Sequence, residues 1–166
     1  DTPYFIDTYR QWSSYEPEEK GVLIVYGSMY GNTEAAAENL AIRLAEKGMS
    51  NISMYDASKT HVSYLIAEAF KYSHIVLASV TYNLNIFPPV ENFIRDMKAL
   101  NLQKRTVAGI ENGTWAPKAG LLMGQLLGEM KEMNVLENKI LIKSSMNKGN
   151  IDEMDALADN IIRSMK

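Results

Sequence analysis

The chain has 166 residues, of which 46% are hydrophobic and 22% charged, and its formal net charge is −3. This size and composition predict one soluble globular domain that can bury a core, and the slight negative charge argues against a nucleic-acid partner. The absence of cysteine excludes disulfides, thiolate catalysis and cysteine-ligated metal centres. No apolar run reaches the roughly 20 residues of a membrane span, and no signal pattern opens the chain, so we expect no membrane association and a cytoplasmic location.

The first 20 residues differ in composition from the rest of the chain. They are rich in aromatic and polar residues, then acidic, and they follow neither a helical nor a strand period. We therefore expect residues 1–20 to form an inter-domain linker or arm, and residues 21–166 to form the domain. Aromatic side chains on this arm predict that it packs onto this domain or onto another one.

Apolar strands and amphipathic helices then alternate along the chain. Strands are predicted at 21–26, 51–55, 74–79, 105–110 and 139–143, and helices at about 32–47, 62–71, 88–100, 120–130 and 151–165. Five such alternations predict an α/β fold: a flavodoxin-like, doubly wound, five-stranded parallel sheet in a three-layer α/β/α arrangement. The expected strand order is 2-1-3-4-5, which brings the loops after strands one, three and four together.

Two local details are also predicted. Thr60 is expected to cap the helix at 62–71. His61 is expected at the surface near that helix start, and His74 at a strand start, so neither is a candidate metal ligand.

The first of the three loops is Gly27-Ser28-Met29-Tyr30-Gly31-Asn32-Thr33-Glu34. A strand, a tight polar loop and a helix N-terminus in succession present backbone amides and hydroxyls to an anion. The loop lacks the lysine of a Walker A motif, and Met29 occupies a position where the dinucleotide fingerprint needs glycine. A mononucleotide with a single phosphate fits this loop. The alternative is an ordinary turn in which Asn32 or Thr33 caps the helix.

The other two loops each bring an aromatic residue to the same end of the sheet. Tyr82 lies in the loop 80–87, and Trp115 lies in the loop 111–120. A flat heteroaromatic ring needs apolar faces and hydrogen bonds around its edge, so the three loops together predict a pocket for flavin mononucleotide, FMN. Alternatively, Tyr82 is a half-buried packing residue and Trp115 a hydrophobic contact at a helix start.

Four segments of the chain resemble the flavodoxin domain of flavodiiron proteins, also called A-type flavoproteins. They are Tyr-Gly-Ser-Met-Tyr-Gly-Asn-Thr-Glu (26–34), Thr-Tyr-Asn (81–83), Ile-Phe-Pro-Pro-Val-Glu-Asn-Phe (86–93) and Glu-Asn-Gly-Thr-Trp-Ala-Pro (111–117). The resemblance spans about 20–166, and the arm corresponds to the inter-domain linker of that family.

The resemblance implies a set of FMN-binding residues. The phosphate is expected on Ser28, Met29, Tyr30, Gly31, Asn32 and Thr33. The ring is expected between loops that contain Thr81, Tyr82, Asn83, Asn85, Asn112, Gly113, Thr114 and Trp115, with Gly120 nearby. No metal site and no acid–base catalytic residue is expected in this chain.

The resemblance also implies partners and an activity. Electrons would come from a donor such as rubredoxin or an NAD(P)H-linked reductase. They would pass to a di-iron site in a metallo-β-lactamase-like domain that this chain lacks, where oxygen or nitric oxide is reduced. The full-length protein would be an oxidoreductase, assembled as a head-to-tail homodimer or tetramer.

The sequence departs from the family pattern in two places, before Thr81 and in Asn83-Leu84-Asn85, where the family usually reads Asn-Asn-Gly. Val80 replaces the usual proline, and Asn85 occupies a position where the family has a glycine beside the flavin. We therefore expect the backbone at Asn85 to be less free than in relatives. Three alternatives stay open: a stand-alone flavodoxin-like electron carrier, an FMN-dependent NAD(P)H:quinone reductase, and a flavin-free interaction domain.

Overall fold

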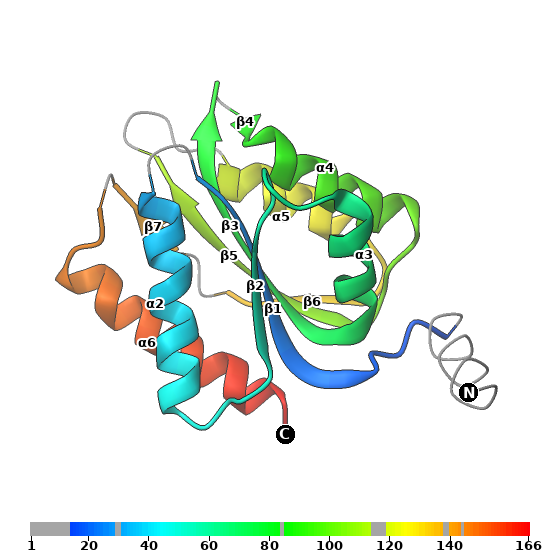
Figure 1. The fold of residues 1–166 in the computed structure, drawn as a ribbon, viewed down its shortest axis with the longest axis horizontal. Helices are drawn as coiled ribbons and strands as arrows, with labels where there is room; N and C mark the ends of the chain where they lie inside the picture. The colour runs from blue at the N-terminus through cyan, green and yellow to red at the C-terminus, as the bar shows by residue number, and fades with distance from the viewer. Residues whose placement is uncertain (1–13, 29–30, 84, 114–118, 138–139, 144) are drawn as a thin grey trace.

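The computed structural model describes residues 14–28, 31–83, 85–113, 119–137, 140–143 and 145–166. A mostly parallel sheet lies between two layers of helices (Figure 1). The strands are β1 (Glu19–Gly27), β2 (Ile52–Asp56), β3 (Tyr72–Tyr82), β4 (Asn85–Ile86), β5 (Arg105–Asn112), β6 (Met133–Val135) and β7 (Ile140–Ile142). The helices are α2 (Asn32–Glu46), α3 (Val62–Lys71), α4 (Pro88–Ala99), α5 (Ala119–Gly128) and α6 (Lys148–Ser164).

The strand order confirms the predicted doubly wound topology. The parallel path runs β2-β1-β3-β5, and both β6 and β7 pair with β5. β6 pairs with the first three residues of β5, and β7 pairs with the last three residues of β5. The predicted fifth strand corresponds to β7, while β6 and the antiparallel β4 are additions to the predicted five strands. These additions are two or three residues long, too short to leave a hydrophobic period in the sequence.

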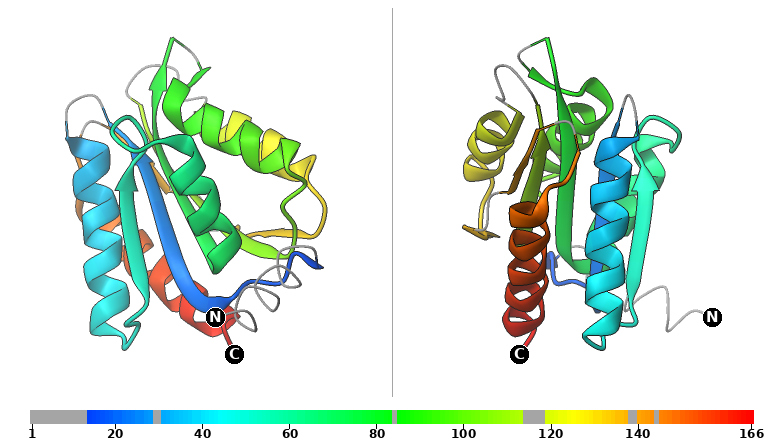
Figure 2. Two further views of the ribbon diagram at one scale, coloured as in Figure 1. Left: turned by 45° about the vertical axis from the view of Figure 1, so that its right-hand side comes forward. Right: turned by 90° about the vertical axis from the view of Figure 1, so that its left-hand side faces the viewer.

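The sheet separates two hydrophobic cores. Helices α3, α4 and α5 cover one face, and α2 and α6 cover the other (Figure 2). In β1, Leu23 and Val25 face the first core, whereas Val22 and Ile24 face the second, and all four side chains are fully buried. The unbroken apolar run of β1 therefore belongs to a central strand that is covered on both sides.

Local hydrogen bonds determine where the helices start. Helix α3 spans 62–71 as predicted, but its cap is His61, whose Nδ1 accepts from the backbone N–H of Ser63 at 3.2 Å. The prediction that Thr60 caps this helix is therefore wrong. Helix α6 starts three residues earlier than predicted because Asn147 and Asn150 form a reciprocal capping box.

Arg105 is a fully buried cation at the start of β5. Its guanidinium donates to the backbone carbonyls of Ala69 and Phe70 at the end of α3, and to that of Tyr15 at 2.5 Å. It also donates to the carbonyls of Gln103 and Lys104. Burial lowers its pKa to about 10, so the side chain stays charged at neutral pH. Arg105 thereby ties residues that precede β1 to the body of the domain.

His74 is a second buried polar group at the same end of the sheet. Its ring bonds to Ser73 Oγ through Nδ1 at 2.6 Å and to Ser164 Oγ through Nε2 at 2.8 Å. Ser164 in turn donates to the carbonyl of Ile161 at 2.7 Å. Burial lowers the pKa of His74 to about 4, so the imidazole is neutral at pH 7. The neutral ring joins the start of β3 to the end of α6.

No helix among the described residues has both the length and the apolar character that crossing a bilayer requires.

Candidate functional site

β1, β3 and β5 end at the same side of the sheet, beside the N-terminus of α2 (Figure 2). The strand register places their last residues side by side: Gly27 pairs with Ser79, and Ser79 pairs with Glu111. The structure therefore brings together the described parts of the three loops that the sequence singled out. Met29, Tyr30, Thr114 and Trp115 lie outside the described residues.

The first loop leads into α2 through a left-handed glycine. Gly31 is the N-cap residue with φ +86°, and its N–H donates to Ser28 Oγ at 2.9 Å. No side chain caps the helix, so the alternative in which Asn32 or Thr33 is the cap is wrong. The first-turn amides of α2 and the positive end of its dipole are then available to an anion.

Among the described residues, Thr33 is the strongest candidate for a direct contact with a ligand. Its side chain is only 1% exposed, and its Oγ1 is the one buried side-chain oxygen or nitrogen of the described part without a hydrogen-bond partner. Leaving a buried hydroxyl unsatisfied costs about 1–3 kcal/mol. A phosphate oxygen at the N-terminus of α2 would accept this hydrogen bond, so the residues present fit a phosphate group.

Acidic side chains lie near Tyr26, the residue before this loop. The pKa of Tyr26 is raised to about 12, first by burial and then by the charge of Glu34 and its hydrogen bond to that carboxylate, with smaller contributions from Asp56 and Glu38. The loop itself contains no lysine or arginine. Backbone amides, hydroxyls and the helix dipole are thus the groups that would offset a phosphate charge here.

The second loop is a β-hairpin. Tyr82 pairs with Asn85, and Asn83 between them has φ +48°. Asn83 is therefore left-handed, whereas Asn85 lies in the extended strand β4. That the backbone at Asn85 is less free than in relatives with glycine stays a prediction. The Tyr82 ring is half-exposed and meets the Phe87 ring edge-on at a centroid distance of 6.0 Å.

Gly27 lets this hairpin approach the end of β1. A Cβ atom at Gly27 would lie 2.5 Å from the Phe87 ring and 2.8 Å from Val90 Cγ2. No side chain fits in that space, so glycine is required for the contact between the first and second loops.

The third loop contributes Asn112, Gly113 and Gly120. Asn112 is buried at the end of β5, and the N–H of Gly113 donates to the carbonyl of Ile142 at 3.0 Å. Gly120, in the first turn of α5, packs against Glu111. Sequence reasoning did not single out Glu111 as a site residue. Its position as the first residue of the loop 111–120, directly before Asn112, is the signal that could have found it.

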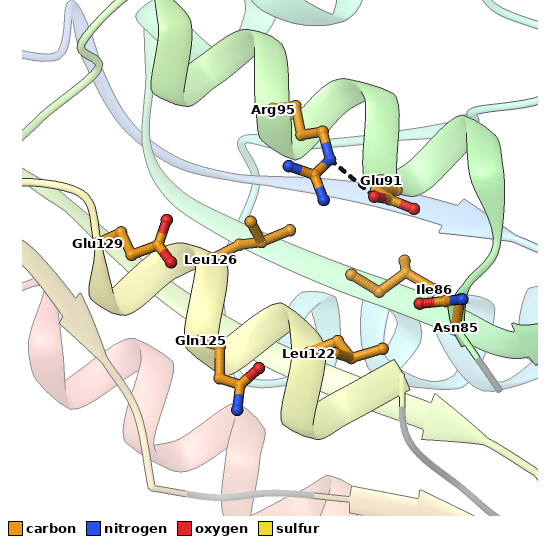
Figure 3. Close-up of a pocket in the computed structure, with 8 residues that line it drawn as sticks. All are labelled: Asn85, Ile86, Glu91, Arg95, Leu122, Gln125, Leu126 and Glu129. Carbon is orange, nitrogen blue, oxygen red and sulfur yellow. Dashed lines mark hydrogen bonds and ion pairs between the residues drawn. The ribbon is translucent and has the colours of Figure 1, made fainter.

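A cavity of about 260 Å³ lies between β4, α4 and α5, next to the hairpin (Figure 3). Ile86, Leu122 and Leu126 line it, and the Arg95–Glu91 ion pair lies at its rim, with an Nε–Oε2 distance of 2.7 Å. Asn85 is the one expected flavin residue among those lining this cavity, so it adjoins the candidate site rather than forming it.

No group of three or more histidine, cysteine, aspartate or glutamate side chains is arranged to hold a metal ion within the described ranges.

The Flavodoxin family model matches residues 24–160, most of the chain. The chain belongs to the flavodoxin family. Membership of this family assigns FMN as the cofactor. The unsatisfied Thr33 hydroxyl and the uncapped N-terminus of α2 agree with a phosphate-bearing cofactor at the end of β1.

Solved structures of flavodiiron proteins share the fold. Rubredoxin oxygen:oxidoreductase from Desulfovibrio gigas matches with a TM-score of 0.88 and 21% identity, over 99% of this chain and 40% of that one. The flavodiiron protein from Giardia intestinalis matches with a TM-score of 0.82 and 19% identity, over 96% of this chain and 40% of that one. A flavodoxin from the domain Archaea matches with a TM-score of 0.74 and 22% identity, over 89% of this chain and 99% of that one.

A curated relative is 30% identical over 95 residues, which are 57% of this chain and 24% of that protein. It is the uncharacterized protein MJ0732 of Methanocaldococcus jannaschii. The chain thus spans about a quarter of this relative and about two fifths of the flavodiiron structures.

Proposed function

We propose that this chain is the FMN-binding electron-transfer domain of a flavodiiron-type oxygen or nitric oxide reductase. The FMN site rests on the buried Thr33 hydroxyl, which lacks a partner among the described residues and lies at the N-terminus of α2. Two observations support the flavodiiron assignment. One is the set of loop motifs at 26–34, 81–93 and 111–117. The other is coverage: flavodiiron structures match 96–100% of this chain, against 87–89% for flavodoxins.

In this proposal each loop has one task. Ser28, Gly31, Asn32 and Thr33 hold the phosphate through amides and hydroxyls. Residues 81–85 and 112–115, with Gly120, flank the ring and exclude water from it. The roles of Met29, Tyr30, Thr114 and Trp115 stay predictions from the sequence.

When bound, FMN supplies one- and two-electron redox chemistry, and the protein supplies position and electrostatics. The chain would accept electrons from a donor such as rubredoxin or an NAD(P)H-linked reductase. It would pass them to a di-iron site in a metallo-β-lactamase-like domain, within a head-to-tail homodimer or tetramer. Oxygen or nitric oxide would be reduced at that domain, and this chain alone would reduce neither at a useful rate.

A second candidate is a stand-alone electron carrier or an FMN-dependent NAD(P)H:quinone reductase. The archaeal flavodoxin favours it, because 99% of that chain is matched by this one without a further domain. Rapid reduction of the bound flavin by NAD(P)H, with no added protein, would distinguish the quinone reductase from the relay domain.

The test begins with the visible absorption spectrum of the purified chain, followed by acid extraction and mass analysis of what is released. We expect a yellow protein that releases FMN and that is reduced by rubredoxin faster than by NAD(P)H. A colourless protein that also fails to bind added FMN would contradict the proposal. Electron delivery is then measured by adding a separately produced di-iron domain and following oxygen or nitric oxide consumption.

A further inference from the structure

Thr81, at the end of β3, connects two loops that the proposed function places beside the flavin ring. Its hydroxyl accepts from the N–H of Ala119, the first residue of α5, at 3.2 Å. The same hydroxyl donates to Glu111 Oε2 at 3.3 Å. A hydroxyl carries only one proton. When Thr81 donates that proton to Glu111, the lone pairs of the Thr81 oxygen face the N–H of Ala119 and can accept from it.

Gly120 provides the space in which the Glu111 carboxylate lies. A Cβ atom at Gly120 would be 2.7 Å from Glu111 Oε1 and 3.3 Å from Glu111 Cδ. An alanine there would therefore displace the carboxylate. The carboxylate also lies beside the first turn of α5, where negative charge is favoured by the helix dipole.

These contacts join β3, β5 and α5 without any ligand. Thr81 begins the hairpin that carries Tyr82 and Asn83, and Ala119 follows directly on the loop that contains Trp115. When the hairpin and the start of α5 are fixed before binding, the protein loses less conformational entropy as a flat ring binds between them. The sequence predicts Thr81 and Gly120 as flavin-site residues, but not Glu111, whose carboxylate contacts both.

We propose that Glu111 is a positioning residue for the flavin ring. It orients the Thr81 hydroxyl as the acceptor for the Ala119 amide and thereby fixes the hairpin against the start of α5. This inference rests on the proposed function for its consequence in FMN binding. The hydrogen-bond relay itself can be tested in the apoprotein.

The first experiment is a double-mutant cycle on the FMN dissociation constant, measured by flavin fluorescence quenching. We expect Thr81→Val and Glu111→Met each to raise the constant about tenfold, the effect of one lost hydrogen bond to a charged group. We expect the double variant to be no weaker than either single variant, because both break the same relay. Glu111→Gln retains an acceptor and should stay within about threefold of the wild type. Thr106→Val, at the opposite end of the sheet, is the matched control and should leave the constant unchanged.

The second experiment is the amide proton shift of Ala119 in nitrogen–proton correlation spectra of the apoprotein. Thr81→Val and Glu111→Met should both move this signal upfield, and Glu111→Gln should largely restore it. If Glu111→Met does not fold, Gly120→Ala takes its place, since it displaces the carboxylate without removing it. The Gly120→Ala effect should then be much smaller in a Thr81→Val background, because both changes break the same relay.

Multiplicative losses in the double variant, or a Gln variant as weak as the Met variant, would overturn the relay. So would an Ala119 signal that moves in neither variant. If the wild type fails to bind FMN while the Ala119 shifts behave as expected, the proposed function fails and the relay stands.

Discussion

The two ends of the sheet differ in one buried polar group. At the end where the parallel strands begin, Arg105 meets five backbone carbonyls, and both ring nitrogens of His74 have hydroxyl partners. At the end where the strands finish, the Thr33 hydroxyl has no partner within the described residues. One end is satisfied internally, whereas the other has an unsatisfied donor that a ligand can satisfy.

This difference distinguishes buried polar groups that stabilise the fold from one that can bind a ligand. Arg105 and His74 are the more conspicuous residues, since each is buried with a strongly lowered pKa. Strongly shifted pKa values often mark active sites. Here both groups have hydrogen-bond partners within the protein and lie far from the three loops, which indicates that they hold the fold together. A single unpaired threonine is the better indicator of the binding site.

The largest effect on stability is expected at the end of the sheet where the parallel strands begin. Arg105→Met would remove the cation and its hydrogen bonds to five carbonyls, so the free energy of unfolding should fall by about 3–5 kcal/mol. Guanidinium denaturation of the wild type and the variant measures this. The FMN dissociation constant of the folded variant should change less than twofold, because the site is at the other end. A loss of stability below about 1 kcal/mol would show that the guanidinium is not structurally required.

His74 should make the domain sensitive to acid. Its folded pKa is about 4, below the value of about 6.5 expected in the unfolded chain. The unfolded chain therefore binds this proton first as the pH falls, and the stability lost between pH 6.5 and 4 should reach about 3 kcal/mol, with no further loss from this group below that range. Unfolding free energies at pH 7, 5.5 and 4 test it. His74→Gln is the control, and an equal acid loss in that variant would contradict the assignment.

Thr33→Val should give the smallest effect on the apoprotein, and with the opposite sign. The valine has the same shape but no hydroxyl to leave unsatisfied, so the free energy of unfolding should rise by about 1 kcal/mol. Chemical denaturation without flavin measures it. A destabilised apoprotein would mean that the hydroxyl has a partner in the protein and is not awaiting a ligand.

The sequence was sufficient for the layers of this fold because burial imposes a period on the residues. Continuous apolar runs such as 22–25 and the apolar stripe of α4 predict central strands and covering helices directly. The short strand β6 could not be predicted, since three residues are too few to show a hydrophobic period of their own.

The residues that bind the cofactor stay a prediction, but some features of the three loops left a signal in the sequence and others did not. The loop that contains Thr33 was identified because glycines, hydroxyls and a following helix have a local signature. Glu111 and Arg105 have none: each acquires its role from partners brought near by the fold, Thr81 for the first and Tyr15 for the second. Those partners lie 30 and 90 residues away in the sequence, where no spacing rule reaches.

The most direct test of a phosphate site at Thr33 compares FMN with riboflavin, which lacks the phosphate. Both dissociation constants are measured by fluorescence quenching for the wild-type apoprotein and for Thr33→Val. The wild type should bind FMN much more tightly than riboflavin. Thr33→Val should weaken FMN binding roughly 10- to 150-fold, from the loss of a hydrogen bond worth about 1.5–3 kcal/mol, and leave riboflavin binding unchanged. Equal weakening of both ligands, or of neither, would contradict the phosphate site.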